Sequence, residues 1–161
     1  MAQELTLSVA APDVARRIGE RLVPGAPASK QIVWENNGDR ILIHGESLKT
    51  RLTGGWLLCD LDIEADQVGK QTVQFVYFLG NATSGDGLSA GTLVNAPTAA
   101  AAQLADRWGA AIQRVIWDAV LDAVEASLVQ AASQSPGQKL TLAGFYATDT
   151  ALTVSVMTGE L

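Results

Sequence analysis

Residues 98–133 read TAAAAQLADRWGAAIQRVIWDAVLDAVEASLVQAAS, and this stretch decides the fold. It is rich in alanine and contains no proline, which predicts one helix that would span about 50 Å if unbroken. On a helical wheel its apolar residues cover well over half of the circumference, more than the roughly 100° that a surface helix buries. We therefore expect the rest of the chain to wrap this helix, or the helix to carry a second partner.

The apolar residues of this helix fall into two groups. A broad sector comprises Leu104, Trp108, Ile112, Val115, Ile116, Ala119 and Ala123. A second row comprises Trp117, Leu121, Val124 and Leu128, beyond a polar line that includes Arg114, Asp118 and Glu125. We favour burial of the second row within the chain, because a wrapped helix has a cover that needs no association. The alternative is a homodimer in which the row meets its own copy.

Alternating apolar and polar residues predict strands on both sides of the long helix. Five such stretches precede it, at 5–9, 32–34, 41–43, 57–64 and 73–79, and two follow it, at 140–142 and 152–156. A shorter amphipathic helix is predicted at 13–22, with Val14, Ile18 and Leu22 on its apolar face. Asn37-Gly38 predicts a hairpin, residues 147–150 predict a turn, and the glycine-rich residues 80–97 predict a long loop.

The predicted order is therefore strand, helix, four strands, long helix and two strands. Runs of strands with segregated helices favour an antiparallel α+β domain over a βαβ one. We expect residues 1–161 to form a single domain, in which a strongly bent antiparallel sheet of about seven strands packs around the long helix. The short N-terminal helix completes this prediction.

Composition excludes several classes of protein. With 48% hydrophobic and 17% charged residues, the 161-residue chain can bury a core without disulfides or metals. Its net charge of −6 argues against nucleic-acid binding, which requires clustered Lys and Arg. The single cysteine, Cys59, fits a reducing compartment. We see no signal peptide or transmembrane segment, so we expect a cytoplasmic protein of bacterial type.

Residues that carry chemistry are few. His44 is the only histidine, and the enzyme alternative is a small dehydratase-like or isomerase-like activity that uses it. Asp60, Asp62, Glu64 and Asp66 are spaced by two, which is typical of the solvated outer face of a strand. One histidine and one cysteine argue against a transition-metal site, and we expect no cofactor.

Apolar shape leads to the main functional expectation. If sheet and helix enclose an elongated apolar cavity, the protein is a non-catalytic binding protein for a hydrophobic or lipid-like ligand. The residues expected to line this cavity are Leu57, Leu61, Phe75, Tyr77, Leu104, Trp108 and Ile112. The alternative is a protein-interaction or assembly module, whose oligomer interface is the surplus apolar face around Trp117 and Leu121.

The element order resembles that of the tubular lipid-binding (TULIP) superfamily. In its single-domain bacterial members a strand leads into an amphipathic helix, as 5–9 leads into 13–22 here. A meander of strands then wraps a long helix, and the chain closes with a strand pair that ends in an alternating run and a glycine, here 152-LTVSVMTG-159. The resemblance implies a groove between helix and sheet that binds lipids or other apolar molecules. It assigns no individual binding residue.

Overall fold

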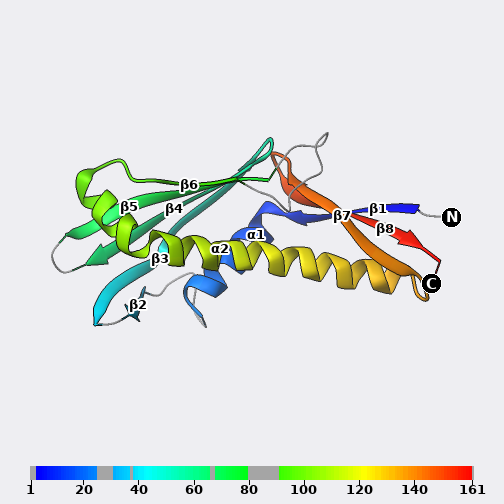
Figure 1. Cartoon of the computed structure of the whole chain (residues 1–161), viewed down its shortest axis with the longest axis horizontal. Coiled ribbons are helices and arrows are strands. Elements are labelled where there is room, and N and C mark those ends of the chain that lie inside the picture. Colours follow the sequence, from blue (N-terminus) through cyan, green and yellow to red (C-terminus); the bar gives the residue numbers. More distant parts are fainter. Residues whose placement is uncertain (1–2, 25–30, 37, 66–67, 80–90, 161) are drawn as a thin grey trace.

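The long helix α2 (Ala99–Gln134) runs along most of the length of the molecule (Figure 1). The computed structural model describes residues 3–24, 31–36, 38–65, 68–79 and 91–160. The other elements within these residues are β1 (Gln3–Ala10), α1 (Ala11–Leu22), β2 (Gln31–Asn36), β3 (Asp39–Thr53), β4 (Trp56–Ala65), β5 (Gly69–Phe78), β6 (Gly91–Asn95), β7 (Lys139–Ala147) and β8 (Ala151–Gly159). The fold is therefore α+β, as the sequence predicts.

The strands form two antiparallel sheets. One sheet has five strands in the order β2-β3-β4-β5-β6, and the other has three strands in the order β1-β8-β7. Figure 1 shows the five-stranded sheet beside the N-terminal half of α2 and the three-stranded sheet beside its C-terminal half. The expected strongly bent antiparallel sheet is present. However, the described residues contain eight strands in two sheets, whereas we expected about seven strands in one.

The two sheets meet at a pair of turns. The backbone N–H of Gly54, between β3 and β4, donates to Oδ1 of Asp149 in the β7–β8 turn over 2.8 Å. The next N–H, of Gly55, donates to the carbonyl of Ala147 over 2.9 Å. Gly55 has a φ of 88°, which a residue without Cβ adopts readily. These hydrogen bonds connect the two sheets at the point where α2 passes from one to the other.

Strand β6 corrects the expectation of a loop over residues 80–97. Residues 80–90 lie outside the described part, but Gly91–Asn95 pair with β5 in the register Phe75↔Val94. The side chain of Val94 reaches α2, where its Cγ1 would lie 3.7 Å from a Cβ placed on Gly109. An edge strand of five residues needs only one partner, so the edge of β5 is enough to order it.

Strand β3 is much longer than the predicted 41–43. The ladder with β4 is interrupted between His44 and Lys49 and then continues to Thr53. The hydroxyl of Ser47 fills the interruption: it donates to the carbonyl of His44 over 2.6 Å and accepts from the N–H of Asp62 over 2.8 Å. This irregularity breaks the apolar–polar alternation, which is why the pattern ends the strand too early.

Helix α2 begins where its sequence predicts, and α1 begins at Ala11, two residues before the predicted start. Pro12 occupies the first turn of α1, followed by Asp13, and Val14, Ile18 and Leu22 are buried as expected. Thr98 caps α2, since its hydroxyl accepts from the N–H of Ala101 over 3.0 Å. A single hydrophobic cluster includes side chains from both sheets and both helices, so α2 is packed along both halves of its length.

Candidate functional site

A cleft of about 560 Å³ lies beside the start of α2. Figure 1 shows that α2 starts at the end of the molecule opposite the two termini. We call this cleft the end cleft. It lies between the first three turns of α2, Gly38 with the start of β3, and the two residues Ala65 and Val68. Its lining residues are Gly38, Asp39, Arg40, Ala65, Val68, Gln103, Leu104, Asp106, Arg107 and Trp108. The volume falls within the range of roughly 300–1,000 Å³ that is usual for small-molecule sites.

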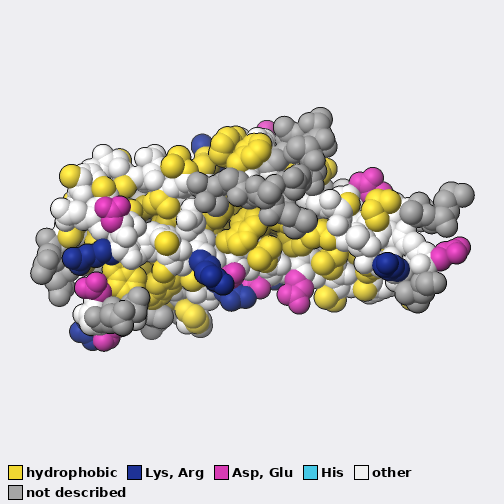
Figure 2. All heavy atoms as spheres, viewed as in Figure 1, with side chains coloured by type: hydrophobic (Ala, Val, Ile, Leu, Met, Phe, Trp, Pro, Cys, Tyr) yellow, Lys and Arg dark blue, Asp and Glu magenta, His cyan; other side chains and the backbone are white. Residues whose placement is uncertain are grey.

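Leu104 and Trp108 form the apolar wall of the end cleft. They are one helical turn apart on the buried face of α2, and their relative exposures are 3% and 6%. Both also belong to the hydrophobic core. Figure 2 shows hydrophobic side chains between acidic and basic ones at this end of the molecule. The cleft therefore joins a charged surface to the apolar layer between α2 and the five-stranded sheet.

Charged side chains surround the mouth of the end cleft. Nη1 of Arg107 lies 3.7 Å from Oδ1 of Asp39, which connects α2 to the β2–β3 turn. On that hairpin, Nε of Arg40 lies 3.5 Å from Oε2 of Glu35. All four side chains are more than half exposed. The mouth is thus polar and open to solvent, whereas the wall beneath it is apolar.

The other residues expected to contact a ligand lie deeper. Leu57, Leu61, Phe75, Tyr77 and Ile112 are fully buried in the core and do not line the end cleft. The phenolic hydroxyl of Tyr77 donates to the backbone carbonyl of Gln113 in α2 over 2.5 Å. The sequence thus placed these side chains on the correct inner faces of the sheet and of α2. That they border a ligand stays a prediction.

The row Trp117, Leu121, Val124 and Leu128 is largely covered within the chain. The indole of Trp117 lies between two rings: it stacks on Tyr77, with centroids 5.9 Å apart at 12°, and is tilted against Phe145 at 6.0 Å. Val124 is 4% exposed, and Leu128 is partly buried against the core. Leu121 is the exposed member, at 38%.

His44 is buried and held by two carboxylates. Its Nδ1 lies 3.1 Å from Oε1 of Glu46, and its Nε2 lies 2.9 Å from Oε1 of Glu64 on β4. His44 does not line the end cleft. A substrate that needed a ring nitrogen as its base would have to displace one of these glutamates. The contacts therefore explain His44 as part of the link between β3 and β4.

Two acidic residues of β4, Asp62 and Glu64, have local partners. Oδ1 of Asp62 accepts from the Thr72 hydroxyl on β5 over 2.5 Å, and Glu64 contacts His44. Asp66 lies outside the described residues. No group of three metal-ligating side chains converges in the part of the chain that the structure covers.

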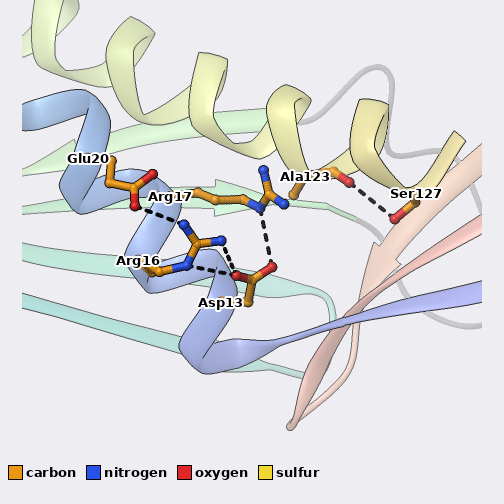
Figure 3. A network of polar contacts seen from close by, with 6 residues as sticks. All are labelled: Asp13, Arg16, Arg17, Glu20, Ala123 and Ser127. Atoms are coloured by element: carbon orange, nitrogen blue, oxygen red, sulfur yellow. Dashed lines mark hydrogen bonds and ion pairs between the residues drawn. The ribbon is translucent and has the colours of Figure 1, made fainter. Parts of the chain in front are cut away.

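The basic residues of α1 are also paired (Figure 3). The guanidinium of Arg16 donates to Asp13 and to Glu20, and Nε of Arg17 donates to Asp13 over 3.2 Å. Arg21 forms a bidentate pair with Asp122 of α2, with both N–O distances 2.7 Å. The pairs of Arg16 and Arg17 lie within α1, and the pair of Arg21 with Asp122 connects α1 to α2.

Sequence reasoning missed an apolar patch on the outer face of the five-stranded sheet. Trp56 and Phe78 face each other across β4 and β5, with ring centroids 4.9 Å apart, and are 42% and 40% exposed. Leu93 on β6 is 61% exposed and pairs with Val76 on the same face. Trp56 and Phe78 lie in the outer phase of their strands next to Leu58 and Val76, and this apolar run was available in the sequence.

Comparisons of the chain with protein-family models, with curated proteins and with solved structures each found no significant match. No helix in the described ranges is long and apolar enough to cross a membrane.

Proposed function

We propose that the protein is a non-catalytic binding protein for a hydrophobic or lipid-like ligand, which enters between α2 and the five-stranded sheet through the end cleft. The observation that carries this proposal is the double role of Leu104 and Trp108, which line the cleft and belong to the core. The buried face of α2 continues beyond them with Ile112 and Ile116. Ile112 and Ile116 are fully buried, so an apolar chain that enters at Trp108 would contact this face by displacing the side chains that cover it.

The order of elements supports the same ligand class. A short helix, a meander of strands, a long helix and a closing strand pair follow one another, as in the TULIP resemblance. The proposal takes from that resemblance only the expectation of an apolar ligand between helix and sheet. The residues that hold the ligand come from the end cleft.

The test is a binding titration combined with a block of the cleft. A fluorescent fatty acid should bind the native protein saturably, and native mass spectrometry should show one added ligand mass. Gln103 is exposed and lines the cleft, so Gln103→Trp should obstruct the mouth without removing a core contact. We expect the affinity to fall at least roughly tenfold, because the block excludes apolar contacts.

Gln130 supplies the matched control. It is an exposed glutamine near the other end of α2, so Gln130→Trp adds the same indole away from the cleft. The control should bind with the parent affinity. The proposal fails if no amphiphile binds the native protein, or if Gln103→Trp binds as tightly as Gln130→Trp while both variants unfold cooperatively.

A second candidate function is assembly with a further protein chain. The exposed pair Trp56 and Phe78, together with Leu93, favours it, because large apolar patches are uncommon on monomers. Light scattering after gel filtration tests this candidate. A parent dimer that becomes a folded monomer on Phe78→Ser would assign the interface to the sheet, whereas the same result on Leu121→Glu would assign it to the row on α2.

A further inference from the structure

We propose that Arg107 and Arg40 bind the anionic head of an amphiphile, a carboxylate or a phosphate, at the mouth of the end cleft. This inference rests on the proposed function, and it adds the chemical class of the ligand's polar end. The tail would lie against Trp108 and Leu104, and the head would stay at the charged mouth.

The first argument is that these two guanidinium groups have unused hydrogen-bond donors. Arg107 lies 3.7 Å from Asp39 and Arg40 lies 3.5 Å from Glu35, beyond the roughly 2.7–2.9 Å of a charge-assisted hydrogen bond. Within the described part of the chain, neither guanidinium donates a hydrogen bond to a protein group. A guanidinium carries five N–H donors, so both arginines can donate to a bound oxyanion without losing an existing hydrogen bond.

The arginines of α1 provide the contrast. Arg21 donates twice to Asp122 at 2.7 Å, and Nη1 of Arg16 donates to Glu20 at 2.8 Å. These two arginines are held by carboxylate partners at hydrogen-bond distance, although they too are at the surface. Arg51 and Arg114 are exposed arginines that likewise donate no hydrogen bond among the described residues, so what distinguishes Arg107 and Arg40 is the apolar wall of the cleft beside them.

The second argument is the placement of the charges around the apolar wall. On α2, Arg107 precedes Trp108 and follows Leu104 by three residues, which puts it about 60° from Leu104 around the helix axis. Asp106 is about 160° from both Leu104 and Trp108, so it lies at the outer edge of the cleft. Arg40 comes from the opposite wall, on β3. A head group above the wall therefore meets guanidinium donors from two sides.

The third argument concerns Asp39, the carboxylate nearest to Arg107. Its contact with Arg107 is long, and both side chains are more than half exposed, so the pair contributes little to stability. A bound oxyanion would take the place of Asp39 beside Arg107. Removing the negative charge of Asp39 should therefore strengthen the binding of an anionic head.

The experiment compares two probes that differ only in the charge of the head: cis-parinaric acid and its methyl ester. We expect Arg107→Gln and Arg40→Gln together to weaken binding of the acid roughly tenfold or more and to leave binding of the ester unchanged. Asp39→Asn should tighten binding of the acid alone. Arg114→Gln is the matched control, because Arg114 is an exposed arginine two turns further along α2 and does not line the cleft.

The outcomes separate this inference from the proposed function. If the parent binds acid and ester equally and the arginine variants change neither affinity, the inference is wrong and the proposed function stands. If the arginine variants weaken both probes alike, the arginines shape the cleft and do not read the charge, which also overturns the inference. If the parent binds neither probe, both proposals fail.

Discussion

Tyr77 and Trp117 connect the five-stranded sheet to the middle of α2 through two contacts at once. The two rings stack nearly parallel, at 12°, and the hydroxyl of Tyr77 donates to the carbonyl of Gln113, one helical turn before Trp117. Stacking fixes the height of the helix above the sheet, and the hydrogen bond fixes its position along the strand. Tyr77 thus holds α2 in register with β5.

Tyr77→Phe should lower the free energy of unfolding by about 1 kcal/mol, because it removes the hydrogen bond and keeps the ring. Urea denaturation followed by circular dichroism measures the change. Tyr146→Phe is the control, since Tyr146 is partly exposed on β7 and should be nearly neutral. Equal losses in the two variants would contradict the role assigned to the hydroxyl.

Cys59 should be unreactive in the folded protein. It is fully buried on β4, and burial raises the pKa of its thiol from 9.0 to about 12. The thiolate is the reactive form, so Ellman's reagent should label Cys59 only when the chain unfolds. Labelling of the native protein within seconds at pH 8 would contradict the buried position.

The same thiol makes stability depend on alkaline pH. Because its pKa is higher in the folded state, its contribution is complete below about pH 9 and is lost as the pH rises toward 12. Burial also raises the pKa of Tyr77, which adds a loss in the same direction at alkaline pH. Denaturant midpoints of the parent and of Cys59→Ala, measured from pH 8 to 11, should converge as the pH rises.

Asp122→Asn should loosen the contact between α1 and α2. The hydrogen bonds from Arg21 lower the pKa of Asp122, so this pair stabilises the fold above the ordinary pKa of 3.8 and the effect is lost as the pH falls below it. At pH 7 we expect a loss of about 0.5–1 kcal/mol, which shrinks at high salt. Asp106→Asn, an exposed aspartate outside any ion pair of the described residues, should show no such loss.

Gly109→Ala should stabilise the protein. Gly109 lies inside α2, where glycine is about 0.8–1.0 kcal/mol less favourable than alanine. An added Cβ would meet Cβ of Ala105 and Cγ1 of Val94 at 3.7 Å, which is ordinary van der Waals contact. Thermal denaturation should show a higher midpoint. Gly38→Ala should lower it, because Gly38 has a φ of 84° that alanine adopts only with strain.

The sequence predicted the elements that have strong periodicity. The buried face of α1, the extent of α2 and the hairpin after Asn36 are confirmed, because an apolar face or a turn signal specifies each of them locally. Strand β6 and the second half of β3 were missed. Backbone pairing with β5 orders β6, and the hydroxyl of Ser47 bridges the irregularity in β3.

The site was harder to predict than the core, because a cleft depends on where the ends of neighbouring helices and strands lie relative to one another. Periodicity placed Trp108 and Leu104 on the inner face of α2, but it says nothing about which inner residues lie at an open end. Arg40 and Arg107 come from segments 67 positions apart in the chain, and no local pattern brings them together. The division into two sheets is a similar case, since it depends on hydrogen bonds between distant turns.

The pairing of β1 with β8 has a consequence for folding during synthesis. Gln3 pairs with Thr158, so, among the described strands, the one made first has as its neighbour the one made last. β8 is also the central strand of its sheet, and β7 has no other partner there. Until β8 emerges, β1, β7 and the C-terminal half of α2 have no complete cover. Such long-range closure slows folding, and it predicts that a nascent chain stalled before β8 binds chaperones and is cleaved by proteases within α2.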